Sequence, residues 1–168
     1  LSWKMDGLTI VLTYNDGQLV KAVTRGNGEI GEVITQNAKV FANVPVSIPF
    51  KGELTLRGEA VIKYSDFERI NATIDDVDAQ YKNPRNLCSG SVRQLNSEIT
   101  AKRHVYFIAY SILESGESFM LNSEILVWLK NQGFDVVGHD IVNSDTIADV
   151  VHEYSVKIAS NDFPSDGL

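Results

Sequence analysis

The fold is decided by residues 8–24, which read LTIVLTYNDGQLVKAVT. Residues 8–14 and 18–24 are two β-rich runs, and Asn15-Asp16-Gly17 between them is a strong signal for a tight turn. Because a turn this short joins strands that run in opposite directions, the stretch predicts an antiparallel hairpin.

The remaining patterns predict an α+β domain with antiparallel sheets. Residues 53–62 alternate as a strand, with Arg57 and Glu59 on the face opposite the apolar side chains. Residues 105–112 form an aromatic-rich strand, and residues 75–82 form a polar loop. Helices are predicted over 32–41, from Ser65 with that serine as N-cap, over 86–95, over 123–131, and from a Ser144-Asp145 cap to about 154. Strands paired through tight turns, with helices interspersed, are typical of the α+β class.

A glycine-rich turn at residues 25–28 carries a motif of a different fold. Residues 26–31 spell G-x-G-x-x-G after a strand and before a helix, which is the dinucleotide fingerprint of the Rossmann fold. Glu29 and Glu32 would place negative charge where the pyrophosphate must lie. The preceding strand also pairs back on its neighbour, so it cannot open a parallel βαβ unit. The Rossmann interpretation is therefore rejected.

Length and composition indicate one globular domain. The 168 residues are 43% apolar and 22% charged, and they contain neither a signal-peptide pattern nor an apolar run as long as a membrane span. Cys88 is the only cysteine, so no internal disulfide can form, which fits a cytoplasmic protein. Neither Cys/His spacing nor an acidic cluster predicts a structural metal site. The three histidines, which are scattered, are His104, His139 and His152.

The charge of the chain is unevenly distributed. The formal net charge is −7, yet residues 82–103 hold five basic side chains against the single acidic Glu98. A local basic stretch in an otherwise acidic chain is consistent with a surface that binds phosphate groups. The alternative is that these side chains form a charged face exposed to solvent. The basic residues are Lys82, Arg85, Arg93, Lys102 and Arg103.

The tetrapeptide Lys4-Met5-Asp6-Gly7 stands directly before the first predicted strand. A positioned and partly desolvated lysine can lose its proton and attack the α-phosphorus of a nucleotide. The motif is short, and an exposed lysine before a strand is the alternative. Lys4 and Asp6 are therefore the candidate catalytic residues.

Several motifs, taken together and in order, resemble the adenylation domain of bacterial NAD-dependent DNA ligase. The N-P-R-N block occurs almost exclusively in the NAD-dependent enzymes. The K-x-D-G motif, in contrast, is shared with ATP-dependent ligases and capping enzymes. The matching segments are Lys4–Gly7, Thr24–Glu32 (T-R-G-x-G-x-x-G-E), Arg57-Gly58-Glu59, Asn83–Gln94 (NPRNLCSGSVRQ), Ile99–Arg103 and Asp166-Gly167-Leu168, where a fourth motif begins.

The resemblance implies a nucleotidyltransferase (ATP-grasp-like) fold and a DNA ligase of bacterial replication and DNA-damage repair. Its substrates are NAD and nicked double-stranded DNA, and Mg²⁺ is expected as cofactor. The enzyme is expected to be monomeric and to have no membrane contact. The alternative is a degenerate, non-catalytic module that binds nucleotide or nucleic acid.

The resemblance also implies residue roles. Lys4 would form a phosphoramide with AMP and expel nicotinamide mononucleotide, while Asp6 would orient the lysine or serve the metal region. Arg25 would hold the phosphate or ribose side. Glu59 would accept hydrogen bonds from the ribose hydroxyls. Tyr110 would stack on adenine. The alternative is that Tyr110 is an aromatic residue of the hydrophobic core.

Two arginines and several departures complete the predicted site. Arg85 and Arg93 are eight residues apart, so a helix would place them on roughly one face, toward phosphates of NAD or DNA. Ser2 stands where the family usually has a glutamate that helps to read adenine, which puts adenine affinity in doubt. Asn27 and Val33 replace acidic residues that are common in the family.

The predicted domain extent is one adenylation-domain core over residues 1–168. This core is expected to lack the family's N-terminal helical subdomain, the lysine of the fifth motif and the C-terminal modules. The isolated chain is therefore expected to adenylate itself poorly or not at all.

Overall fold

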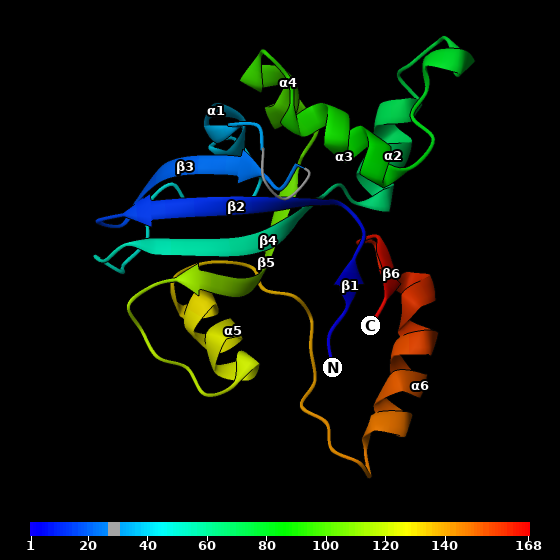
Figure 1. Cartoon of the computed structure of the whole chain (residues 1–168). Coiled ribbons are helices and arrows are strands. Elements are labelled where there is room, and N and C mark those ends of the chain that lie inside the picture. The colour runs from blue at the N-terminus through cyan, green and yellow to red at the C-terminus, as the bar shows by residue number, and fades with distance from the viewer. Residues whose placement is uncertain (27–30) are drawn as a thin grey trace.

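A computed structural model describes residues 1–26 and 31–168, and its centre is a four-stranded antiparallel sheet. The strand order is β3-β2-β4-β5, and a separate antiparallel pair, β1 with β6, lies beside it (Figure 1). The strands are β1 (Lys4–Met5), β2 (Leu8–Asn15), β3 (Gln18–Thr24), β4 (Leu54–Val61), β5 (Tyr106–Glu114) and β6 (Ser165–Gly167).

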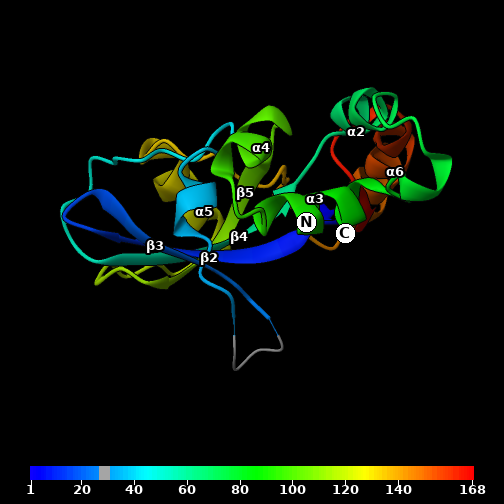
Figure 2. The ribbon, with the colours of Figure 1, turned by 90° about the horizontal axis from the view of Figure 1, so that it is seen from above.

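The helices of the described residues leave one face of the sheet open. Figures 1 and 2 show α1, α3 and α4 on one side of β2, β3 and β4, while no helix covers the opposite side. The α5 helix packs against β5, and α6 lies beside the β1–β6 pair. The helices are α1 (Thr35–Ala38), α2 (Tyr64–Asn71), α3 (Pro84–Val92), α4 (Ser97–Lys102), α5 (Asn122–Asn131) and α6 (Ile147–Lys157), with 3₁₀ turns at Val77–Ala79 and Ile158–Ser160.

Alternation along the strands separates an inner from an outer sheet face. On β2, the side chains of Ile10, Leu12 and Tyr14 are fully buried against the helices. The intervening Thr9 and Val11 are only half-buried and lie on the outer face. Since side chains alternate with a period of two, β4 divides in the same way, and its polar side chains share the outer face.

The predicted hairpin is confirmed. β2 and β3 pair antiparallel from Asn15–Gln18 to Ile10–Thr24, and Asp16 and Gly17 at the turn both have positive φ. The strands predicted over 53–62 and 105–112 are present as β4 and β5, so the mixed helix and strand architecture with antiparallel sheets is correct. The glycine turn at 25–28 and the motif at 26–31 both include residues outside the described parts of the chain.

The helix predicted over 32–41 is wrong in length. Only Thr35–Ala38 is helical, because Val33 forms a bridge with Val23 and the Ile34 N–H donates to the Ala22 carbonyl. The side chain of Val33 is 68% exposed, so it is not part of a buried helix face. Hairpin pairing thus overrides the helical periodicity of this segment.

Two predicted helix caps are also wrong. Ser65 lies inside α2, and its N–H and hydroxyl both donate to the carboxylate of Asp162 instead. The last long helix begins at Ile147, and the side chain of Asn143 accepts the N–H groups of Asp145 and Thr146 that precede it.

The helix predicted over 86–95 begins and ends earlier. Asn83 caps it by accepting the Asn86 N–H, and Pro84 occupies the first turn, where its missing N–H costs nothing. Arg93 is the residue at which it ends, and the short α4, capped by Asn96, was not predicted. The predicted loop at 75–82 contains the 3₁₀ turn Val77–Ala79.

None of the helices in the described ranges is long and apolar enough to cross a lipid bilayer.

Candidate active site

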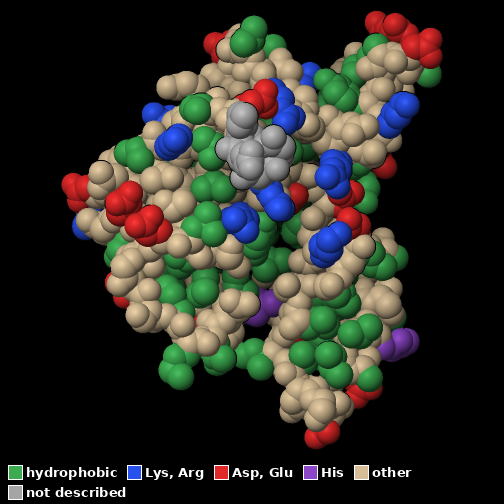
Figure 3. Space-filling view, viewed as in Figure 1, with side chains coloured by type: hydrophobic (Ala, Val, Ile, Leu, Met, Phe, Trp, Pro, Cys, Tyr) green, Lys and Arg blue, Asp and Glu red, His purple; other side chains and the backbone are tan. Residues whose placement is uncertain are grey.

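A cleft of about 690 Å³ lies where the β1–β6 pair meets the outer face of β4 and β5. Figure 3 shows the molecule hollowed between the lobe that holds α6 and the body of the sheet. Five of the predicted site residues line this cleft although they come from distant parts of the chain. They are Ser2, Lys4, Glu59, Arg85 and Tyr110.

Lys4 lies on β1, opposite Gly167 of β6. Its Nζ donates to Oδ1 of Asp166 at 2.6 Å, and the two side chains are 64% and 42% exposed. The contact with Lys4 lowers the pKa of Asp166. A lysine that acts as a nucleophile must be neutral and must leave this ion pair. Because an exposed pair is weak, little free energy is needed to release the lysine toward a substrate.

Gly7 explains how the lysine motif reaches β4. A Cβ at Gly7 would overlap the carbonyl oxygen of Ala60 and the side chain of Val61. The absence of a side chain therefore lets the segment between β1 and β2 cross close over β4. This close approach brings Lys4 and Glu59 into the same cleft.

Asp6 does not line the cleft itself but is bound to a residue that does. Its Oδ1 accepts a hydrogen bond from Nη1 of Arg85 at 2.8 Å. Arg85 projects from the first turn of α3, and the Asp6 N–H is held by the Pro164 carbonyl at 2.9 Å. Asp6 thus connects α3 with the chain just before β6.

Glu59 lies on the outer face of β4, opposite Thr9 of β2. The Thr9 hydroxyl donates to its Oε2 at 3.1 Å. Burial raises the pKa of Glu59, while the Thr9 hydroxyl, the Gly7 N–H and the Arg85 charge act in the opposite direction. Its carboxylate is therefore held in place with capacity to accept further hydrogen bonds from a ligand.

Tyr110 owes its position to a bulge in β5. The β4–β5 register pairs Arg57 with Ser111 but Gly58 with Ala109, so Tyr110 is the extra residue between them. Bulges bend a strand and redirect a side chain, and they are common next to active sites. Tyr110 lines the cleft and also packs against a small apolar cluster, and burial raises its pKa.

Besides Asp6, two predicted residues, Arg25 and Arg93, are absent from the lining of this cleft. Arg25 follows β3, and its N–H donates to the Thr9 carbonyl at 3.0 Å, which places it beside the cleft rather than on its wall. Arg93 pairs with the Glu32 carboxylate and also donates to the Ser89 carbonyl at 3.1 Å. Both arginines are therefore engaged in ion pairs, Arg93 with Glu32 and Arg85 with Asp6, but only Arg85 also lines the cleft.

Sequence reasoning missed several residues of the cleft. Asp166 was noted only as the start of a motif, not as the partner of Lys4, and the two residues are 162 positions apart. Thr9, Ser111 and Asn122 were not singled out, yet all three line the cleft. No local pattern marks them, because each reaches the site through sheet register or helix packing.

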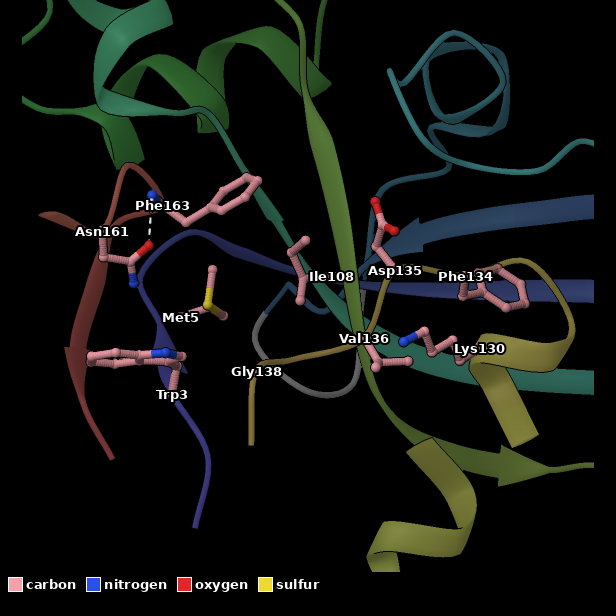
Figure 4. A pocket seen from close by; sticks show the side chains of 10 residues that line it. All are labelled: Trp3, Met5, Ile108, Lys130, Phe134, Asp135, Val136, Gly138, Asn161 and Phe163. Atoms are coloured by element: carbon pink, nitrogen blue, oxygen red, sulfur yellow. Dashed lines mark hydrogen bonds between the residues drawn. The ribbon is translucent and has the colours of Figure 1, made fainter. Parts of the chain in front are cut away.

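A second pocket of about 490 Å³ shares Trp3 and Met5 with the cleft but contains none of the predicted site residues. Figure 4 shows its mainly apolar lining, with Ile108, Val136 and Phe163 among the labelled side chains. Because Trp3 and Met5 line both spaces, β1 forms part of the wall between them. The pocket is suited to apolar groups rather than to the predicted chemistry.

The described residues contain no group of three or more His, Cys, Asp or Glu side chains placed to hold a metal ion. Mg²⁺ is usually bound by one or two carboxylates together with substrate phosphates and water. Asp6 follows Lys4 by two residues in the sequence and Asp166 accepts from the Lys4 amine, so carboxylates of the kind that Mg²⁺ binds are present near the lysine motif.

Comparison with known proteins gives similarity over the whole chain. A family model described as NAD-dependent DNA ligase adenylation domain matches residues 1–168. DNA ligases of Lachnoclostridium phytofermentans and Ruminiclostridium cellulolyticum are 62% and 61% identical over 170 aligned residues, which cover 100% of this chain. The DNA ligase of Campylobacter lari is 38% identical over 98% of the chain. The chain spans 26% of the length of each of these relatives.

Proposed function

Because the chain belongs to the NAD-dependent DNA ligase adenylation domain family, we propose that it performs lysine adenylation within a nick-sealing enzyme. The observation that carries this proposal is the convergence of Lys4, Glu59, Arg85 and Tyr110 on one cleft. The fold is then of the nucleotidyltransferase, ATP-grasp-like type. The full-length protein would act as a monomer in the bacterial cytoplasm, during DNA replication and repair.

In the first step, Nζ of Lys4 attacks the α-phosphorus of NAD. A P–N bond forms, the pyrophosphate P–O bond breaks, and nicotinamide mononucleotide leaves. The lysine nitrogen gives up two protons in total, one before the attack and one on forming the phosphoramide. Asp166 holds the amine at the cleft until substrate replaces it as partner.

The nucleotide is positioned by three side chains. Tyr110 offers a ring face for adenine stacking, and the fixed carboxylate of Glu59 accepts from the ribose hydroxyls. Arg85 presents a guanidinium to the phosphate side, where its planar fork suits phosphate oxygens. Ser2 lines the same cleft and has only a short hydroxyl with which to contact the base.

Mg²⁺ would be held by Asp6 and Asp166 together with the substrate phosphates. When bound, it neutralises charge on the phosphates, and positioning with charge neutralisation provides most of the catalysis in phosphoryl-type transfer. Arg85 supplies positive charge that the chain itself contributes at the cleft, since Lys4 must be neutral when it attacks.

The second and third steps use nicked DNA. An oxygen of the 5′-phosphate attacks the phosphorus of the lysine adenylate, the P–N bond breaks, and the AMP moves to the DNA end. The 3′-hydroxyl then attacks the DNA phosphate, loses its proton and expels AMP. These steps apply to the full-length protein, of which the chain is the adenylating part.

The test is mass spectrometry of the full-length protein after incubation with NAD and Mg²⁺. We expect a mass gain of one AMP, which Lys4→Ala abolishes and Lys157→Ala, on α6, leaves intact. The absence of a gain in the unaltered protein would instead favour the degenerate binding module. Family membership and the assembled cleft both favour the enzyme over that alternative.

A further inference from the structure

Trp3 is the residue directly before Lys4, and it links the lysine strand to two other parts of the molecule. Its ring lies against the ring of Tyr154 on α6, with the centroids 4.5 Å apart and the planes inclined at 40°. It also packs against the small apolar cluster beside β5, which includes Ile108. Its backbone N–H donates to the Gly138 carbonyl at 3.0 Å, so both its backbone and its side chain are held.

The α6 helix packs closely through one side chain. Of its eleven residues, all of which the structure describes, only Tyr154 is buried, with 3% of its surface exposed. The space between α6 and the β1–β6 pair remains a groove of about 370 Å³, lined by Val151 on the helix and Gly167 on β6 among others. The buried ring through which α6 packs therefore meets the residue that precedes the lysine.

Gly138 leaves room for the Trp3 ring. A Cβ at Gly138 would lie 3.0 Å from Cδ1 and 3.5 Å from Nε1 of Trp3, and the shorter of these distances is tighter than ordinary packing. The missing side chain thus lets the backbone approach the indole closely. The ring is seated between neighbours that leave it little freedom to move.

The direction of the Lys4 side chain depends on its neighbours in the strand. Its own ion pair with Asp166 is exposed and must be released before the amine can attack. Successive side chains of an extended chain project to opposite faces, so the seat of the Trp3 ring also sets where the next side chain points. This matters for the rate, because a displacement of about 1 Å can slow a reaction roughly 10²-fold.

We propose that Trp3 and Tyr154 are positioning residues, whose stacked rings hold β1 so that the Lys4 amine stays aimed into the cleft after it leaves Asp166. This inference rests on the proposed function, because it takes Lys4 as the nucleophile. Neither ring takes part in bond formation. Trp3 also lines the cleft, so a direct contact with NAD is the alternative that the experiment has to separate from positioning.

The experiment measures the rate of AMP attachment and the KM for NAD in the full-length protein with Mg²⁺. Tyr154→Leu keeps apolar bulk but removes the ring, and it should slow AMP attachment by roughly 10- to 100-fold without raising the KM. Tyr154→Phe keeps the ring and should keep the rate. Trp3→Leu should slow the reaction as well, and the double variant should be little slower than either single variant, since both lose one shared contact. The control is Phe119→Ala, which removes a ring contact with Trp128 outside the cleft and should leave the rate unchanged.

A second readout separates positioning from a general structural role. A nicked duplex that already carries AMP on its 5′-phosphate is sealed by attack of the 3′-hydroxyl, without Lys4, so Tyr154→Leu should seal it at the unaltered rate. Equal slowing of both reactions would overturn the inference, as would a raised KM for NAD or a normal rate of AMP attachment. Where Tyr154→Leu does not fold, Trp3→Leu decides by the same criteria. An unaltered protein that takes up no AMP would overturn the proposed function and the positioning role with it, whereas an active protein with equally active variants would overturn the positioning role alone.

Discussion

The two sheets of this molecule differ in what they bury. The four-stranded sheet places fully buried side chains such as Leu12, Leu54 and Leu56 against the helices. The β1–β6 pair holds an exposed ion pair, Lys4 with Asp166, and contributes little to the main core. The comparison indicates that the large sheet stabilises the fold while the small pair carries the chemistry. Substitutions in the two sheets should therefore have separable effects.

The largest effect on stability is expected for Leu12→Ala. Leu12 is fully buried, and deletion of a buried leucine side chain typically costs 2–5 kcal/mol. The neighbouring Val11→Ala, on the outer face of the same strand, should cost clearly less. The free energy of unfolding of both variants should be measured by denaturant unfolding. Equal losses of this free energy would mean that the two faces of β2 are packed alike.

A large effect on both stability and activity is expected for Gly7→Ala. The new Cβ would overlap the Ala60 carbonyl oxygen, so β1 must move away from β4, at a cost of roughly 1–3 kcal/mol. Since Lys4 moves with β1, AMP attachment should fall by roughly 10²-fold. Gly90→Ala, within α3, is a suitable control, because its Cβ would make only ordinary contact with the Tyr81 ring and its φ is not positive. A Gly7→Ala variant with normal adenylation would show that β1 tolerates the shift.

The sheet and much of the site could be predicted from the sequence, because both depend on local signals. The Asp16-Gly17 turn fixed the hairpin, and the alternation around Glu59 fixed the faces of β4. The motifs led to the correct family. What failed was the helix at 32–41, where pairing of Val33 with the hairpin competes with a helical pattern.

The parts of the cleft that sequence could not provide depend on long-range register. Nothing near Lys4 predicts that Asp166 is its partner, since the two meet only when β1 pairs with β6. In the same way, Tyr110 was identified as a candidate, but the bulge that gives it its position is a property of the β4–β5 pairing. The roles proposed for all of the predicted site residues, the three arginines included, stay predictions.

A smaller and pH-dependent effect is expected for Glu59→Gln. Burial raises the pKa of Glu59 in the folded state, so the ionised carboxylate is less favourable there than in the unfolded chain. The protonated carboxyl of Glu59 therefore favours the folded state. This contribution to the free energy of unfolding is fully present below the usual glutamate pKa and is lost as the pH rises through the folded-state pKa. The glutamine variant should melt higher than wild type at pH 7 and converge with it below the usual pKa.

The matching readout for Glu59→Gln is affinity for NAD. Loss of the charged acceptor should raise the KM for NAD in the full-length protein even as the melting temperature rises. A variant less stable than wild type at pH 7 would mean that the hydrogen bonds from Thr9 and Gly7 outweigh the cost of burial.

The smallest effect on stability is expected for Asp166→Asn, in the small sheet. Its ion pair with Lys4 is exposed to solvent, and such pairs contribute little to folding, so the melting temperature should not change measurably. Adenylation should nevertheless fall, because the cleft loses a carboxylate that is proposed to bind Mg²⁺ as well as to hold the Lys4 amine. Asp162→Asn is the matched control, since Asp162 accepts from Ser65 at the start of α2 and lies outside the cleft. That variant should lower the melting temperature slightly and leave adenylation intact. The opposite pattern in the two aspartates would mean that the β1–β6 pair stabilises the fold, and the division between a stabilising and a reacting sheet would be wrong.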